Sequence, residues 1–322
     1  MKKRNWLLPE EGSFYKANLH CHTTNSDGKW TPEQVKKAYR ERGYSIVAFT
    51  DHNRYAFHKD LCDEDFLALA ALEVNIDRPM GETGTWNTTP VYHLNFYAQD
   101  PEHLSSVPLP DRYEYSVEAV NRYIVQMRKL GFLCCYNHPW WSLQTVEDYS
   151  GLENLDAFEI FNYGCEVEGL YGYAPQAYAD LLRTGRKLAC FAADDNHNAY
   201  PTEDMRSDAF GGFTMLKLPE LTYEAVFDAI RKRHCYASDG PEFHSLYVED
   251  GILHVTCSEA EKIYVHSEGR KTSFALAERG GSLKEACIPL KGTEQFIWVE
   301  MRDSKGHFAA TSAYCAEELF AR

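Results

Sequence analysis

The sequence lacks any apolar run long enough to span a bilayer, and no apolar stretch typical of a secretory signal peptide follows its basic N-terminus. Its ten cysteines show no paired spacing, so we expect reduced core thiols and no disulfides. The sequence has fewer basic than acidic residues, with 33 Lys and Arg against 48 Asp and Glu, which gives a formal charge of −15. These absences predict a cytoplasmic protein without a membrane segment, and they disfavour long nucleic acid as a partner.

The chain does contain enough apolar side chains for a large core. At 322 residues and 44% hydrophobic content, it can form one large domain plus a small one. Over roughly the first 240 residues, apolar strand-like runs alternate with amphipathic helical segments, the first of which starts at Thr31-Pro32. This alternation predicts a parallel α/β barrel, and an open doubly wound sheet is the alternative topology.

The pattern changes at Asp239-Gly-Pro241. Beyond this point the sequence predicts short strands, beginning with a hairpin whose turn is Asp250-Gly251. We therefore predict two domains, residues 1–243 and residues 244–322. The second is expected to be a small antiparallel, sandwich-like β domain without a cluster of metal ligands.

Potential metal ligands stand at the ends of successive apolar runs. If Tyr15 to Cys21 is a strand, His20 and His22 share a face and can hold one ion, and Asp27 follows on the loop. Imidazole and carboxylate ligands without thiolate suit zinc, manganese or iron engaged in hydrolysis. The candidates at later run ends are His52, Glu73, His93, His138, Asp195 and His197. For the run ending at Glu73, a helix with an exposed carboxylate is an equal alternative.

Taken together and in order, these motifs closely resemble the polymerase and histidinol phosphatase (PHP) superfamily. They are His20-Cys-His22, Ser26-Asp-Gly28, Thr50-Asp-His-Asn53, Glu73, His93, His138-Pro139 and Asp195-Asn-His197. The resemblance spans roughly residues 15 to 240, and the β tail is similar to the C-terminal extension of some stand-alone members. It implies a distorted (β/α)7 TIM-like barrel that binds two or three divalent ions (Zn, Mn or Fe).

The resemblance also implies how the ligands are shared. One ion would be held by His20, His22, Glu73 and Asp195, a second by Asp27, His52 and His197, and a third by Glu73, His93 and His138. The implied activity is hydrolysis of a small phosphate ester (a phosphomonoester, a nucleotide or a short oligonucleotide end) by attack on phosphorus of a hydroxide held between the ions. Asp195, Glu73 and His197 would be the catalytic residues.

Two kinds of side chain are candidates for substrate contacts. Arg54 and Arg206 could bind the phosphate, and a solvated surface arginine is an equal alternative for each. Tyr136, Trp140 and Trp141 flank His138 and could stack on a ring of the substrate, whereas packing in the core or at the rim is the alternative.

Two other functions remain open at this stage. A barrel amidohydrolase acting on C–N or C–O bonds would use similar ligands, although such enzymes often recruit a carbamylated lysine where this chain has Glu73. A non-catalytic, metal-bound regulatory module is the second alternative, but degenerate modules lose ligands and this sequence retains all nine. The sequence leaves the specific substrate and the oligomeric state open.

Overall fold

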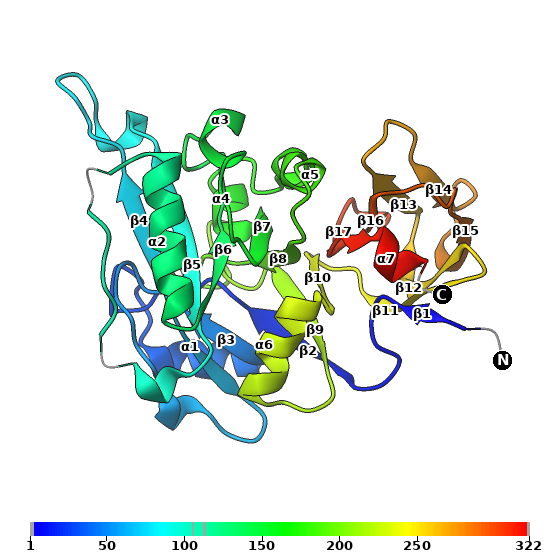
Figure 1. The fold of residues 1–322 in the computed structure, drawn as a ribbon. Helices are drawn as coiled ribbons and strands as arrows, with labels where there is room; N and C mark the ends of the chain where they lie inside the picture. Colours follow the sequence, from blue (N-terminus) through cyan, green and yellow to red (C-terminus); the bar gives the residue numbers. More distant parts are fainter. Residues whose placement is uncertain (1–2, 105, 112–113, 321–322) are drawn as a thin grey trace.

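The computed structural model describes residues 3–104, 106–111 and 114–320 as a mixed α/β structure (Figure 1). The helices are α1 (Pro32–Arg40), α2 (Val117–Lys129), α3 (Val146–Tyr149), α4 (Tyr163–Val167), α5 (Pro175–Arg183), α6 (Tyr223–Lys232) and α7 (Ala316–Leu319), with 3-10 turns η1 (Lys59–Leu61), η2 (Trp86–Thr88) and η3 (Pro101–His103). None of the described helices is long and apolar enough to cross a bilayer.

The strands form one sheet of 14 strands and one of 4. The large sheet contains β2 (Ser13–Asn18), β3 (Tyr44–Phe49), β4 (Leu67–Asp77), β5 (Val91–Ala98), β6 (Phe132–Tyr136), β7 (Ala157–Asn162), β8 (Ala189–Ala193), β9 (Phe213–Leu218), β10 (Cys235–Ser238), β13 (Lys262–Ser267), β14 (Ser273–Leu276), β16 (Phe296–Arg302), β17 (Phe308–Thr311) and β18 (Tyr314–Cys315). The small sheet contains β1 (Asn5–Trp6), β11 (Phe243–Glu249), β12 (Ile252–Ala260) and β15 (Leu283–Pro289).

The large sheet is not the all-parallel set that the strand–helix alternation predicts. The pairs β2/β3, β3/β4, β6/β7 and β7/β8 are parallel, but β4/β5 and β5/β6 are antiparallel. The reason is local, because residues 78–90 between β4 and β5 contain only η2 and no crossover helix. The hydrogen-bonded order of the described strands runs from β14 to β8 without closing. The closed barrel is therefore not confirmed.

Side-chain hydroxyl groups bridge the open edge of β8. The Thr214 hydroxyl accepts from the Ala192 amide at 3.1 Å and donates to the Ala192 carbonyl at 2.9 Å. The Ser312 hydroxyl accepts from the Cys190 amide and donates to the Cys235 carbonyl, both at 3.1 Å. Backbone groups at this edge thus find side-chain partners from β9 and from the segment after β17 without a ladder, as buried polar groups require.

Each of four helices packs on a strand that adjoins it in the sequence. α1 packs on β3, α2 on β6, α5 on β7 and α6 on β9 (Figure 1). The predicted start of α1 is confirmed, because Thr31 caps the helix and forms a capping box with Gln34. β3 and β4 are buried along nearly their whole length, which fits continuous apolar runs rather than alternating ones. The open question about residues 66–73 is resolved in favour of a strand, and Glu73 is buried within it.

Two strand pairings join the C-terminal strands to the rest of the chain. The predicted hairpin is confirmed as β11 and β12, and Asp250 and Gly251 at its turn have φ of 51° and 75°, as a two-residue turn of this kind requires. β1 adds to β11, and β17 pairs with β10 of the large sheet. The short β1 strand and the β10/β17 pairing were not expected from the sequence.

Glu300 on β16 ties this region to the rest of the chain. Its carboxylate accepts from the Tyr173 hydroxyl at 3.0 Å, from Arg302 Nε at 2.6 Å and lies 3.2 Å from His266 Nε2. Burial opposes ionisation, but the His266 hydrogen bond and the Arg302 guanidinium hold the pKa of Glu300 below its usual value.

We expect Glu300→Gln to destabilise the protein by about 2 kcal/mol at neutral pH, because one partner of a largely buried ionic network is neutralised. Since the folded-state pKa is depressed, this stabilisation is present above the unfolded pKa of Glu and is lost as pH falls through the folded value. Urea unfolding at pH 7 and near pH 3 would show a difference between variant and wild type that shrinks in acid. Glu285→Gln, at an exposed position of β15, is the control. A pH-independent difference would contradict the assignment.

Candidate metal centre

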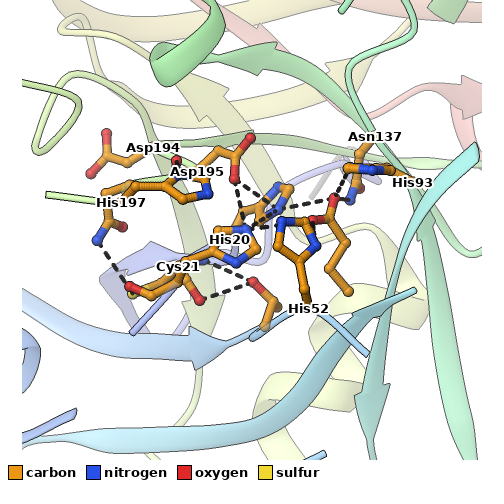
Figure 2. Close-up of polar contacts among 12 residues, drawn as sticks. His20, Cys21, His52, His93, Asn137, Asp194, Asp195 and His197 are labelled. Carbon is orange, nitrogen blue, oxygen red and sulfur yellow. Dashed lines mark hydrogen bonds and ion pairs between the residues drawn. The ribbon is translucent and has the colours of Figure 1, made fainter. Parts of the chain in front are cut away.

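The candidate ligands converge from strand ends that are far apart in the sequence (Figure 2). His20 and His22 follow β2 and are both fully buried. Their Nε2 atoms lie 3.3 Å apart, and each lies close to Asp195 Oδ1, at 3.1 Å for His20 and 2.9 Å for His22. The predicted shared direction of the two imidazoles is therefore observed. A bridge between Cys21 and Asn196 brings the two segments together.

Glu73 stands at the centre of the cluster, and five imidazoles surround its carboxylate. The distances to Glu73 oxygens are 3.2 Å from His20 Nε2, 3.4 Å from His22 Nε2, 3.1 Å from His52 Nδ1, 2.9 Å from His93 Nδ1 and 3.2 Å from His138 Nε2. Asn137 Nδ2 also donates to Glu73 Oε1 at 3.1 Å. Because Glu73 lies on β4 between the parallel neighbour β3 and the antiparallel neighbour β5, ligands from both sides reach it.

A second group gathers around Asp27 on the loop after β2. Asp27 oxygens lie 3.7 Å from His22 Nδ1, 3.6 Å from His52 Nε2 and 3.4 Å from His197 Nε2. The Asp27 side chain is about half exposed, at 52%, whereas His22 is buried. This side of the cluster is thus the more open one.

All nine predicted ligands fall into four groups whose ligand atoms lie within 4.8 Å of one another. The groups are His20, His22, Glu73 and Asp195; His22, Asp27, His52 and His197; His52, Glu73 and His93; and His20, His138 and Glu159. The first matches the implied ligand set of one ion, and the second adds His22 to the implied set. The implied third set is divided, because His93 groups with His52 whereas His138 groups with His20 and Glu159.

The electrostatics of the cluster favour ionised carboxylates. Burial opposes charge on Asp195 and Glu73, but the surrounding histidines hold the pKa of both carboxyls well below the usual range. Burial likewise opposes charge on His22, yet the adjacent carboxylates of Asp195 and Glu73 raise its pKa to about 10. For His52, burial prevails and lowers the pKa to about 4. Metal binding at such a site must displace protons from imidazoles, so metal affinity should rise with pH.

Several buried polar atoms of the cluster fit a metal as the missing partner. Glu73 Oε2, Asp195 Oδ1 and His22 Nδ1 are buried and have no hydrogen-bond partner of acceptable geometry among the described residues. Unsatisfied buried polar atoms are costly in a folded protein, and these three belong to groups of converging N and O atoms. The donor set of imidazoles and carboxylates suits divalent zinc, manganese or iron. The residues therefore fit the ions that the sequence resemblance implies.

Asp195 itself adopts a strained backbone conformation. Its φ is 52°, in the left-handed region that non-glycine residues seldom occupy. Its amide donates to the His20 carbonyl at 3.0 Å, which fixes the turn. Strain of this kind is retained where the surrounding structure imposes it, often at functional sites. Its side chain is 13% exposed, so the cluster meets solvent here.

The two neighbouring aspartates have structural partners. Asp194 accepts from the amides of Phe210, Gly211 and Gly212 and from the Tyr39 hydroxyl. Asp51 accepts from the Thr23 amide and from the hydroxyls of Thr23 and Ser26. Both carboxylates therefore hold the loops that carry ligands in place.

The structure places the two predicted phosphate-binding arginines at the surface. Arg54 donates to the Asn25 carbonyl at 2.9 Å, on the same loop as Asp27. Arg206 pairs with Asp204 at 2.7 Å and stacks over Tyr200 at 4.0 Å from the ring centroid. Neither has a described contact with a candidate ligand, so both remain proposals.

Glu159 is a site residue that the sequence did not reveal. It is 2% exposed in the middle of β7, and its Oε1 lies 2.9 Å from His20 Nδ1. Asn162, at the end of β7, donates through Nδ2 to both Glu159 Oε2 and Asp195 Oδ2, each at 3.0 Å. A single acidic residue within an otherwise apolar run was the only available signal, and such a residue is commonly exposed. With its Nδ1 directed at Glu159, His20 presents Nε2 to the ligand cluster.

We expect Glu159→Gln to lower metal affinity about tenfold and Glu159→Ala about a hundredfold, because carboxylates that orient a ligating histidine typically contribute in this range. Competition with a chromogenic chelator would measure the affinity without depending on turnover. Glu153→Gln, at an exposed position, is the control. Unchanged affinity in the alanine variant would contradict the orienting role.

Comparison with known proteins supports the fold. No family model matches the chain, and no curated protein matches it. A two-domain protein from Bacteroides vulgatus, described as containing a predicted PHP-like metal-dependent phosphoesterase, is structurally similar over 98% of this chain and 99% of its own, with a TM-score of 0.51 and 14% identity. A protein from Bifidobacterium adolescentis, inferred to be a metal-dependent phosphoesterase, aligns with 61% of this chain and 91% of its own, with a TM-score of 0.40 and 16% identity. The similarity to the first of these structures confirms the resemblance at the level of the fold.

Proposed function

We propose that this chain is a metal-dependent phosphoesterase that hydrolyses a small phosphate ester. The observation that supports this most is the buried carboxylate of Glu73 surrounded by five imidazoles, with Asp195 next to two of them. An arrangement with so many converging ligand atoms is costly to keep for stability alone, because buried charges require compensation. Multi-ion hydrolysis of phosphate esters uses such arrangements.

The charge balance agrees with an anionic substrate. Three divalent ions would bring six positive charges against the ligand carboxylates of Asp27, Glu73 and Asp195, so the loaded pocket would be cationic within an acidic protein. When bound, such ions supply Lewis acidity, lower the pKa of a coordinated water and neutralise charge on the phosphate.

The residues of this chain have separate tasks in the proposal. Asp195 and Glu73 supply ionised oxygens close to His20 and His22, and Glu159 with Asn162 orients His20 and Asp195. His197, with Asp27, forms the more exposed side, where a substrate can enter. Arg54 would approach the phosphate from the loop after β3, where it is held against the Asp27 loop by its hydrogen bond to Asn25, whereas Arg206 would first have to release Asp204.

An amidohydrolase function has less support than a phosphoesterase function. Glu73 fills the central position where barrel amidohydrolases often carry a carbamylated lysine. A purely regulatory module would not require all nine ligands to converge.

We further propose that strands β2 to β10 of the large sheet form a distorted (β/α)7 barrel whose seam at β8 is closed by the Thr214 and Ser312 hydroxyls. The division at residues 243/244, a cytoplasmic location and a small phosphorylated substrate as partner also remain proposals. Because β1 joins the C-terminal sheet and β17 pairs with β10, the two proposed domains would share an extensive boundary.

The deciding experiment is turnover of metal-reconstituted protein against a panel of phosphomonoesters and phosphodiesters, with amides and lactones in parallel. We expect two or three ions per chain by elemental analysis and release of inorganic phosphate or of a monoester product. Cleavage of an amide or lactone with every phosphate ester left intact would establish the amidohydrolase alternative instead. Fewer than one ion per chain after reconstitution with manganese, iron or zinc would rule out both hydrolases.

A further inference from the structure

Exposed aromatic side chains gather in the loops that follow the site strands. Among the described residues, the large exposed aromatics are Trp86, Trp140, Tyr171, Tyr200 and Phe274. The first four lie in the loops that follow β4, β6, β7 and β8, the strands that carry or precede candidate ligands. Trp86 and Tyr171 are both 70% exposed. Large aromatic surface is costly to leave in water, so its concentration near one site indicates a binding role.

One pair of these rings reaches the candidate ligands. The Trp141 ring lies 5.0 Å from the His93 ring and 5.4 Å from the His138 ring, measured between centroids. Trp86 packs edge-on against Trp141, with centroids 5.7 Å apart and an interplanar angle of 72°. Trp86 comes from the loop between β4 and β5, which extends past the end of the sheet in Figure 1. The two indoles thus form an aromatic wall that begins at the metal cluster and ends in solvent.

A second pair of exposed aromatic rings includes Trp140, the residue directly before Trp141 in the sequence. Trp140 packs edge-on against Tyr171, with centroids 4.9 Å apart. Tyr136, which the sequence also suggested for stacking, is instead fully buried in the core, where it lies 5.8 Å from Phe158. Of the three aromatics flanking His138, the two tryptophans therefore remain available for a ligand.

We propose that the Trp86–Trp141 wall binds a planar ring on the alcohol part of the phosphate ester, so that the substrates are ring-bearing esters such as nucleotides rather than aliphatic or simple sugar phosphates. This inference rests on the proposed phosphoesterase function. A phosphate held by the cluster places its ester substituent within reach of Trp141, because that ring already touches two candidate ligands. A flat, polarisable ring gains most from an indole face, and the exposed side of Trp86 provides one.

The asparagine side chains that contact the candidate ligands are occupied by those ligands. Asn75 and Asn137 are directed inward, to His93 and Glu73 respectively, and so support the ligands rather than the substrate. Recognition by stacking alone tolerates different bases, since every base has a π-face. We therefore expect selection for a ring, with little preference among purines and pyrimidines.

The test compares adenosine 5′-monophosphate with ribose 5-phosphate, which share phosphate and sugar and differ only in the base. For metal-replete wild type we expect kcat/KM to be at least about tenfold higher for the nucleotide, since stacking on an aromatic side chain typically contributes a factor of this order. Trp86→Ala should lower kcat/KM for the nucleotide about tenfold, mainly through KM, and change that for ribose 5-phosphate less than twofold. Trp86→Phe should restore most of the loss. Phe274→Ala, at a distant exposed aromatic, is the matched control.

A binding measurement separates this inference from the proposed function. Quenching of tryptophan fluorescence by the nucleotide, but not by ribose 5-phosphate, should occur in wild type and weaken in Trp86→Ala whether or not either ester is hydrolysed. If both esters are inert but this selective binding is seen, the phosphoesterase proposal fails and the ring site stands. If ribose 5-phosphate is hydrolysed and bound as well as the nucleotide, or if Trp86→Ala affects both equally, the ring site is overturned.

Discussion

Asp195→Asn is expected to lose at least about a thousandfold in turnover while its fold stays nearly intact. The substitution preserves shape, but it removes an anionic oxygen that lies 2.9 Å from His22 Nε2 and 3.1 Å from His20 Nε2. A misplaced or absent ion at this position should cost on the order of 4 kcal/mol of transition-state stabilisation. Steady-state kinetics on the best phosphate ester, with metal content and thermal unfolding measured on the same samples, would check this.

The neighbouring residue offers a matched contrast. Asp194 binds three backbone amides and the Tyr39 hydroxyl rather than the cluster, so Asp194→Asn should lower the unfolding temperature more than Asp195→Asn does. The number of metal ions bound per folded molecule should fall less in Asp194→Asn than in Asp195→Asn. If Asp195→Asn kept more than about a tenth of wild-type turnover, a loss of under roughly 1.4 kcal/mol, Asp195 would not be a ligand.

The candidate ligands could be selected from the sequence because they are local signals. His20-Cys-His22, Thr50-Asp-His-Asn53 and Asp195-Asn-His197 each place polar residues directly after an apolar run, and parallel strand ends gather at one edge of a sheet. The capping box at Thr31 and the Asp250-Gly251 turn were predictable for the same reason, since each depends on only a few adjacent residues.

The parts that the sequence did not predict depend on distant partners. Whether Glu73 belonged to a strand or a helix was decided by burial of β4 between β3 and β5, which no local pattern specifies. Glu159 resembles any isolated acidic residue until His20 is placed 2.9 Å away. The pairing of β1 with β11 joins residues about 240 positions apart, and the hydroxyl bridges at β8 depend on side chains from β9 and from the segment after β17.

Glu73→Gln should remove more metal than any other single ligand substitution. Glu73 contacts five imidazoles through its two carboxylate oxygens. His52, like Glu73, belongs to two of the four ligand groups, but His52→Ala leaves the group of His20, His22, Glu73 and Asp195 complete. Glutamine keeps the shape of the side chain but supplies one neutral oxygen in place of two anionic ones, so it cannot bridge two ions with the same strength.

We therefore expect Glu73→Gln to lose more than one ion per chain by elemental analysis, against about one ion for His52→Ala, and to lose at least about a thousandfold in turnover. In the absence of metal, the free energy of unfolding of Glu73→Gln should be roughly 3 kcal/mol lower than that of wild type, because the imidazoles around residue 73 lose a buried counter-charge. Glu102→Gln, at a surface glutamate paired with Lys59, controls for the substitution itself. If Glu73→Gln bound as much metal as wild type, Glu73 would be a hydrogen-bond acceptor for the histidines rather than a bridging ligand. The ions would then have to be held by the group around Asp27 and by His20, His22 and Asp195 alone.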